Sequence, residues 1–216
     1  MADLKVGVAI SGRGSNLQAL IEACAAPDLP ARIVTVISNV AEAYGLERAK
    51  AAAIPAQVID HRGFPDRESF DSALDEAFAA AGAELVCLAG FMRLLSPGFV
   101  NRWRDRLINI HPSLLPAFKG VHTHERALEA GVRLTGCSVH FVRAEMDSGP
   151  IIVQAAVPVA PDDSPESLAE RIRAAEHRCF PLALRLIAEG RVRIIGEVVH
   201  ILDQESAEGM LINPTP

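Results

Sequence analysis

The chain has 216 residues, 50% of them apolar, with a mean hydropathy of +0.21, which suits one domain with a buried core and excludes a largely disordered protein. Its formal net charge of −6 excludes binding of a nucleic-acid backbone by bulk charge. Its longest apolar runs fall far short of the roughly 20 residues that cross a bilayer, and its N-terminus lacks the segments of a secretory signal. We therefore expect a cytoplasmic protein without nucleic-acid or membrane partners.

The first half of the chain alternates strand-like and helix-like segments. An apolar run at residues 5–10 ends in a glycine turn, after which apolar residues recur at positions i, i+3, i+4 and i+7. Ser96 and Pro97 have the residue types of a helix cap and a first helical turn. We predict strands at 5–10, 32–37, 56–59, 84–91 and 106–111, helices at 17–24, 43–53 and 70–81, and a short helix opened by Ser96.

A different pattern begins at Gly136. An alternating segment at 136–142 and an apolar segment at 151–159 flank a turn, which predicts two antiparallel strands at one side of the sheet. A long amphipathic helix is expected from about Ser164, then a terminal hairpin. These segments predict an α/β fold with an open, mostly parallel twisted sheet, helices on both faces and an antiparallel extension in the C-terminal part. We expect a single domain over 1–203 and a loose tail over 204–216.

The glycine turn after the first strand predicts an anion site. Glycines at such a turn let the backbone approach an oxyanion while the first helical N–H groups point at it. Gly12 to Asn16 fit this pattern, but the lysine of a nucleotide P-loop and the third glycine of a dinucleotide fingerprint are missing. We therefore expect a single phosphate group rather than ATP or NAD. The alternative is that the glycines only permit a tight turn and that Ser15 caps the helix.

A second group of polar residues lies where a later strand ends. Asn109 and His111 are two residues apart on a strand, so their side chains leave the same face near its carboxyl end. Histidine can move a proton near neutral pH, and an amide beside it can stabilise a developing oxyanion. Asp147 is a candidate for the carboxylate that orients the imidazole. The alternative is that Asn109 and His111 bond to loop backbone and that Asp147 only forms a turn.

The cysteines and the remaining histidines give no pattern of a metal site. Cys24, Cys87, Cys137 and Cys179 contain no C-x-x-C pair, so we expect all four to be small buried apolar residues. The His122-Thr123-His124 segment has no third ligand at a recognised spacing and fits a helix start or a substrate contact better. We therefore predict no metal.

Four segments together carry a resemblance to a known family. They are residues 11–23 (SGRGSNLQALIEA), 88–97 (LAGFMRLLSP), 108–131 (INIHPSLLPAFKGVHTHERALEAG) and 136–154 (GCSVHFVRAEMDSGPIIVQ). They closely resemble the phosphoribosylglycinamide formyltransferases, folate-dependent enzymes of purine synthesis, from about Lys5 to the end of the long helix. The resemblance implies the Rossmann-like formyltransferase fold and formyl transfer from 10-formyltetrahydrofolate, a co-substrate, without metal or ATP. It leaves open a monomer or a homodimer.

The resemblance also implies residue roles. Asn109, His111 and Asp147 match the family's catalytic residues. The phosphorylated substrate, glycinamide ribonucleotide, is expected at Gly14, Ser15, Asn16 and Glu176. The folate is expected at a larger set of positions, which comprises Arg67, Met92, Arg93, Leu94, Leu95, Asn109, Arg143, Ala144, Glu145, Met146 and Asp147.

The implied reaction is direct transfer. The glycinamide amine attacks the formyl carbon, Asn109 and protonated His111 stabilise the tetrahedral oxyanion, and Asp147 holds His111 and relays the proton. Two alternatives stay open: a formyltetrahydrofolate deformylase, whose relatives carry an additional N-terminal domain, and a catalytically silent module that binds folate or a sugar phosphate. A methionyl-tRNA formyltransferase fits less well, because that family adds a C-terminal domain and needs basic surface for tRNA.

Overall fold

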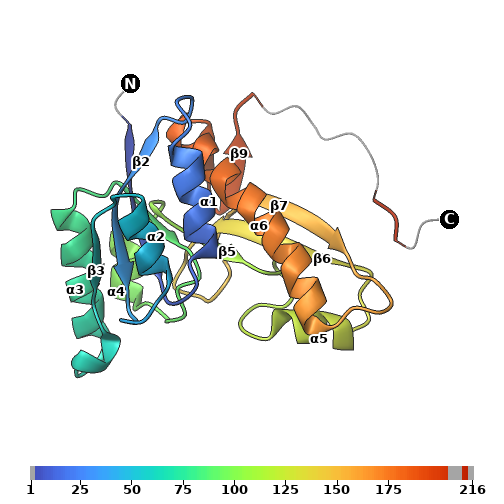
Figure 1. Cartoon of the computed structure of the whole chain (residues 1–216). Helices are drawn as coiled ribbons and strands as arrows, with labels where there is room; N and C mark the ends of the chain where they lie inside the picture. The colour runs from blue at the N-terminus through green and yellow to red at the C-terminus, as the bar shows by residue number, and fades with distance from the viewer. Residues whose placement is uncertain (1–2, 204–210, 214–216) are drawn as a thin grey trace.

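The computed structural model describes residues 3–203 and 211–213. Its main element is a seven-stranded sheet with strand order β3-β2-β1-β4-β5-β6-β7. The strands of this sheet are β1 (Leu4–Ile10), β2 (Ala31–Ser38), β3 (Ala56–Val58), β4 (Leu85–Leu88), β5 (Leu107–His111), β6 (Leu134–Phe141) and β7 (Ile151–Pro158). The first five pair in parallel, and β6 is antiparallel to both β5 and β7. The predicted mostly parallel sheet with an antiparallel extension is confirmed (Figure 1).

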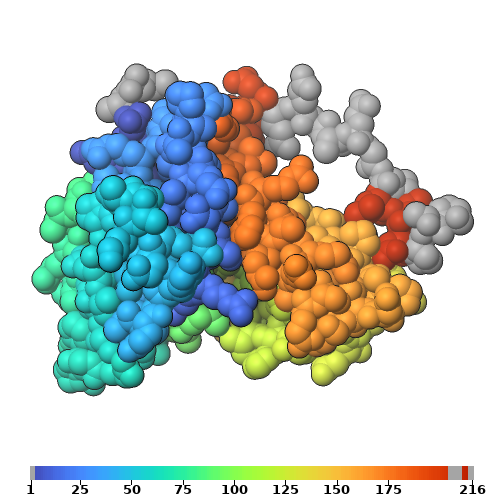
Figure 2. Space-filling view, viewed as in Figure 1, coloured from blue at the N-terminus to red at the C-terminus, as the bar shows by residue number. Residues whose placement is uncertain are grey.

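Helices cover both faces of the sheet, as predicted. They are α1 (Ser15–Cys24), α2 (Gly45–Ala51), α3 (Arg67–Ala80), α4 (Pro97–Arg102), α5 (Thr123–Glu129) and α6 (Pro165–Ala188), with a short 3-10 turn, η1 (His61–Gly63). α1 and α6 lie side by side, and Figure 2 shows both at the surface of the same face. The hairpin of β8 (Val192–Ile195) and β9 (Val198–Ile201) follows α6 and confirms the predicted terminal hairpin.

The sheet is buried from both sides because successive strand residues point to opposite faces. On β1, Val6, Val8 and Ile10 belong to the core cluster that α1 and α6 complete. Ala9 belongs to a second cluster with the aromatic face of α3 and α4. Gly7 is required there, because a Cβ atom would lie 2.4 Å from the ring of Phe78.

Two helix ends follow the predicted capping chemistry. The Ser96 hydroxyl accepts from the Phe99 N–H at the start of α4, with Pro97 in the first turn. Ser164 caps α6 and forms a capping box with Ser167. The predicted 43–53 helix is shorter, because α2 begins at Gly45 and ends at Ala51.

The cysteine prediction needs one correction. Cys87, Cys137 and Cys179 are buried, whereas Cys24 is only half-buried because it lies in the last turn of α1. The predicted loose tail over 204–216 lies outside the described residues except for 211–213. No helix in the described part of the chain combines the length and apolar character that a membrane crossing requires.

Candidate active site

The predicted polar residues gather at the carboxyl ends of the central strands. Strands β2 and β3 lie on one side of β1, and β4 and the later strands lie on its other side, so the strand order switches between β1 and β4. Open α/β sheets bind ligands at such a switch point. The glycine turn follows β1, the segment 89–96 follows β4, and His111 ends β5. These segments therefore meet at the same edge of the sheet.

His111 and Asp147 lie side by side although 36 positions separate them. The Asp147 Oδ2 atom is 3.5 Å from the His111 Nδ1 atom, and both side chains are largely buried. The His111 Nε2 atom lies 3.0 Å from the Phe118 carbonyl oxygen. Each ring nitrogen of His111 thus faces an oxygen that accepts hydrogen bonds, the Asp147 carboxylate at Nδ1 and the Phe118 carbonyl at Nε2.

Asp147 is fixed by the backbone as well as by the histidine. Its φ angle of 50° is in the left-handed region, which non-glycine residues rarely adopt. Its Oδ2 atom accepts a hydrogen bond of 2.8 Å from the Gly120 N–H. Asp147 is therefore more than a turn former: it joins the loop after β6 to the loop after β5.

His140 is a site residue that the sequence analysis missed. It lies on β6 directly opposite Asn109 on β5, and its Nε2 atom is 3.3 Å from the Asn109 amide nitrogen and 3.8 Å from Asp147. Its Nδ1 atom lies 2.9 Å from the Phe141 carbonyl oxygen. The sequence held no local signal for this contact, because it depends on the register in which β5 pairs with β6.

The charge state of His140 follows from its surroundings. Burial lowers the pKa of His140 below its usual value, since the charged form loses its hydration. A neutral ring with its proton on Nδ1 donates to Phe141 and accepts at Nε2 from the Asn109 amide. His140 thus orients Asn109, and the second amide N–H of Asn109, which has no acceptor within residues 3–203 and 211–213, can donate to another group.

The glycine turn has the geometry of an anion site. Gly14, with φ 68°, is the N-cap of α1, and a glycine has no side chain with which to cap the first turn. The alternative that Ser15 caps α1 is wrong, because Ser15 is already the first helical residue. Free N–H groups in the first turn carry partial positive charge and attract phosphate.

Glu176 reaches this turn from α6. Its Oε2 atom accepts a hydrogen bond of 2.9 Å from the Asn16 side-chain amide, and both residues are buried. Burial raises the pKa of Glu176, with partial opposition from the Asn16 hydrogen bond and the Arg173 charge. Two residues predicted at the phosphorylated substrate are therefore in direct contact across 160 positions.

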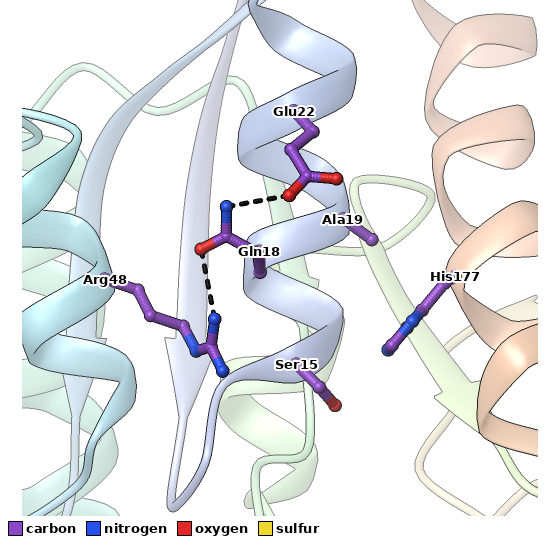
Figure 3. Close-up of a pocket in the computed structure, with 6 residues that line it drawn as sticks. All are labelled: Ser15, Gln18, Ala19, Glu22, Arg48 and His177. Atoms are coloured by element: carbon purple, nitrogen blue, oxygen red, sulfur yellow. Dashed lines mark hydrogen bonds between the residues drawn. The ribbon is translucent and has the colours of Figure 1, made fainter. Parts of the chain in front are cut away.

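Arg48 is a second residue that the sequence analysis missed at this turn. A hollow between α1, α2 and α6 is lined by Ser15, Gln18, Ala19, Glu22, Arg48 and His177 (Figure 3). Arg48 donates to the Arg13 carbonyl and to Gln18, and its guanidinium lies over the Tyr44 ring. It therefore places a cation in the same hollow as Ser15.

The predicted folate residues lie on two loops and one helix start. Met92 and Leu94 are exposed, at 74% and 55%, in the segment after β4, whereas Leu95 is half-buried. The Arg93 guanidinium lies over the ring of Phe70, which belongs to α3. Arg67 is the first residue of α3, and its side chain is exposed. The segment after β4 therefore presents two exposed apolar side chains, Met92 and Leu94.

The loop after β6 contributes differently from what its sequence suggests. Ala144, Glu145 and Met146 are exposed, and Glu145 pairs with Lys119 at 3.1 Å. The Arg143 side chain is largely buried against Asp105 and Glu197. At Arg143, only the backbone remains available for a ligand at the site.

The His122-Thr123-His124 segment lies at the start of α5, which agrees with the helix start that was one of its two expected roles. His122 is the N-cap of this helix, and its Nδ1 atom lies 3.5 Å from Glu125. Over residues 3–203 and 211–213, no group of three His, Cys, Asp or Glu side chains has the arrangement of a metal site.

Comparison with known proteins gives one family. The family model described as "Formyl transferase" matches residues 4–184. The chain is 53% identical over 191 residues to the trifunctional purine biosynthetic protein adenosine-3 of Gallus gallus, which covers 88% of this chain but 19% of that protein. It is 43% identical to the phosphoribosylglycinamide formyltransferase of Haemophilus influenzae, with 91% and 93% of the two chains covered.

Solved structures agree with these relatives. Glycinamide ribonucleotide transformylase 1 from Symbiobacterium toebii has a TM-score of 0.91 and 51% identity, with 93% of this chain and 95% of that chain covered. A formyltetrahydrofolate deformylase from Pseudomonas syringae has a TM-score of 0.87 and 29% identity, with 93% and 66% covered. The chain thus spans a fifth of the first curated relatives and nearly the whole of its single-function bacterial relatives.

Proposed function

Because the chain belongs to the formyl transferase family, we propose that it transfers the formyl group of 10-formyltetrahydrofolate to the amine of 5'-phosphoribosylglycinamide. The products are the formylated ribonucleotide and tetrahydrofolate, in a step of purine synthesis. The observation that carries the proposal is the contact of His111 with Asp147 at the strand ends, beside an uncapped helix start that suits a phosphate.

The substrates are placed by the two halves of the site. The phosphate is held by the first-turn N–H groups at Gly14, Ser15 and Asn16, with Arg48 beside them and Glu176 at the ribose. The folate lies against Met92, Leu94 and the loop that ends at Asp147. Holding the amine and the formyl carbon together between these two anchors supplies much of the rate.

The chemistry needs an oxyanion site and a proton path. The amine nitrogen attacks the formyl carbon, and the formyl oxygen takes the place of the Phe118 carbonyl at His111 Nε2 while the free Asn109 N–H donates to it. Collapse of the intermediate breaks the bond between the formyl carbon and the folate nitrogen. Asp147 passes the amine proton to that nitrogen through water and holds His111 protonated.

Hydrolysis by the same site is the second candidate, since a deformylase shares the fold. In that reaction water replaces the amine, and no phosphate anchor is required. The buried contact between Asn16 and Glu176 and the cation at Arg48 favour the transferase, because they build a site for a phosphorylated co-substrate. We further propose that the enzyme acts in the cytoplasm as a monomer or homodimer, independently of nucleic acid.

The deciding experiment follows release of tetrahydrofolate from 10-formyltetrahydrofolate, with and without the glycinamide ribonucleotide, in the absence of ATP and added metal. Release that requires the amine supports the transferase. Release that is equal without the amine contradicts it and favours the deformylase. No release under either condition contradicts both and leaves a silent binding module.

A further inference from the structure

Arg143 is a largely buried cation immediately before the catalytic loop. Its side chain is 10% exposed. Its Nε atom donates to Glu197 Oε2 at 2.7 Å, one Nη atom donates to Asp105 Oδ1 at 2.8 Å, and the other donates to the Val142 carbonyl at 3.2 Å. A planar guanidinium that binds two carboxylates in this way has little freedom to turn.

The two carboxylates come from distant parts of the chain. Asp105 lies in the turn before β5, where its φ angle is 59°. Glu197 lies at the tip of the β8–β9 hairpin, after Gly196, and its second oxygen pairs with Arg104 at 2.6 Å. The hairpin tip is therefore tied to the residues that precede β5 and to Arg143, two positions after the end of β6.

Arg143 anchors one end of the loop that carries Asp147. The other end is closed by the Phe141 N–H, which donates to the Pro150 carbonyl at 2.9 Å, and by Gly149, where a Cβ atom would lie 1.7 Å from the Phe141 oxygen. Between these ends, residues 144–146 are exposed. Arg143 is thus the buried side chain on the approach to Asp147, four positions before it.

We propose that Glu197 and Asp105 form a clamp on Arg143 that positions the loop and so holds the Asp147 carboxylate against His111. Glu197 is then a positioning residue for formyl transfer, supplied by the C-terminal hairpin. This inference rests on the proposed function for the role of Asp147 in turnover, whereas the clamp itself is a property of the ligand-free protein.

The Gly120 N–H reports on the clamp without any substrate. It donates to Asp147 Oδ2 at 2.8 Å, so a displaced Asp147 leaves this amide without its acceptor. In Glu197→Gln, which keeps the side-chain shape and removes the charge, we expect faster hydrogen exchange of the Gly120 amide and a changed proton chemical shift in NMR spectra.

Turnover gives the second measurement. We expect Glu197→Gln to lower kcat about three- to tenfold, since small displacements of a catalytic group are costly even when single exposed ion pairs are weak. The KM for the phosphorylated substrate should change little, because the turn that follows β1 contains none of the clamp residues. Glu189→Gln is the matched control, since Glu189 pairs with Arg185 and Arg191 before the same hairpin.

A third variant separates the clamp from general loosening of the hairpin. Glu197→Gln made in an Arg143→Ala background should add nothing to the loss from Arg143→Ala alone, because the clamp is already absent. An undiminished further loss overturns the proposal, and so does an equal loss in Glu189→Gln. Unchanged Gly120 exchange in Glu197→Gln also overturns it. If the unmodified protein lacks transferase activity, the proposed function fails while the Gly120 measurement still tests the clamp.

Discussion

The buried polar side chains beneath the strand ends form a chain of contacts. Neutral His140 accepts from Asn109, Asp147 lies against His111, and the Gly120 N–H fixes Asp147. Such a buried network is rigid when each polar group has a partner, and rigidity is what an oxyanion site requires. Small changes of charge at one residue should therefore affect turnover more than binding.

Asp147→Asn tests the charge at this position. Asparagine keeps the shape and can still accept from the Gly120 N–H, but it cannot hold a protonated His111 or relay a proton. We expect kcat to fall on the order of 100-fold or more, with both KM values largely kept, in steady-state assays. His111→Ala should behave alike. Near-normal turnover in either variant would remove that residue from the mechanism.

Glu176→Gln tests how much the buried carboxylate of Glu176 destabilises the folded protein when it is ionised. Because burial raises the pKa of Glu176, the folded state binds a proton more tightly than the unfolded state does. The stability from this group is full below its unfolded pKa of 4.5 and is lost as the pH rises through the folded pKa. We therefore expect the Tm of the variant, relative to that of the unmodified protein, to increase as the pH rises from 4.5 to neutral in thermal denaturation.

The same substitution should weaken the phosphorylated substrate's binding, since Glu176 contacts the substrate turn through Asn16. A Tm difference that does not change with pH would show that ionisation of the buried Glu176 carboxyl does not destabilise the folded protein. Glu170→Gln, the same substitution at an exposed position of α6, serves as the control for the stability measurement.

At the scale of elements, the turn between β1 and α1 is shaped by its contact with α2. The Gly45 N–H donates to the Gly12 carbonyl at 3.0 Å, and Arg48 donates to the Arg13 carbonyl at 2.9 Å. The Ser11 hydroxyl accepts from the Met92 N–H at 2.8 Å, which ties the same turn to the segment after β4. The turn after β1 and the segment after β4 are thus joined by this bond and by the Ser11 N–H, which donates to the Gly90 carbonyl at 3.1 Å.

Gly14→Ala tests the close approach of these elements. A Cβ atom at Gly14 would lie 2.6 Å from the Gly45 Cα atom, and the φ angle of 68° disfavours any other residue. We expect the KM for the phosphorylated substrate to rise about tenfold or more, with a smaller change for folate, because the first-turn N–H groups are displaced. Equal increases in both KM values would indicate general misfolding instead.

At the scale of the whole molecule, stability against acid depends on carboxylates that are paired with arginine. The side chain of Asp163, just before the cap of α6, is 3% exposed and binds both terminal nitrogens of Arg171, whose side chain is 40% exposed. The Arg171 guanidinium lowers the pKa of Asp163 well below its usual range. This pairing stabilises the folded chain above the unfolded pKa of 3.8, and the contribution is lost as the pH falls through the folded pKa.

Asp163→Asn should therefore reduce the free energy of unfolding at pH 7 by about 1–2 kcal/mol, a value moderated by the partial solvation of Arg171. In urea denaturation, the difference from the unmodified protein should narrow as the pH falls below 3.8. A difference that stays constant down to pH 2 would contradict the assigned cause. Asp28→Asn, which breaks an exposed pair with Arg185, is the control and should have little effect.

Features that depend on neighbouring residues could be predicted from the sequence. The period of apolar residues identified the order of strands and helices, and Ser96 with Pro97 marked the start of α4. The spacing of Asn109 and His111 placed them on one face of a strand that ends at the ligand-binding edge. These predictions succeed because backbone preference, capping and side-chain alternation act within a few residues.

The tertiary structure alone decided which distant residues meet. The pairing of β5 with β6 brings His140 opposite Asn109, α2 brings Arg48 beside Ser15, and the hairpin brings Glu197 to Arg143. Nothing local in the sequence specifies these contacts, because strand register and helix packing are set by the burial of the whole core. The sequence by itself therefore determined the fold class and the placement of Asn109 and His111 on β5, and the packing of distant elements decided which side chains surround them.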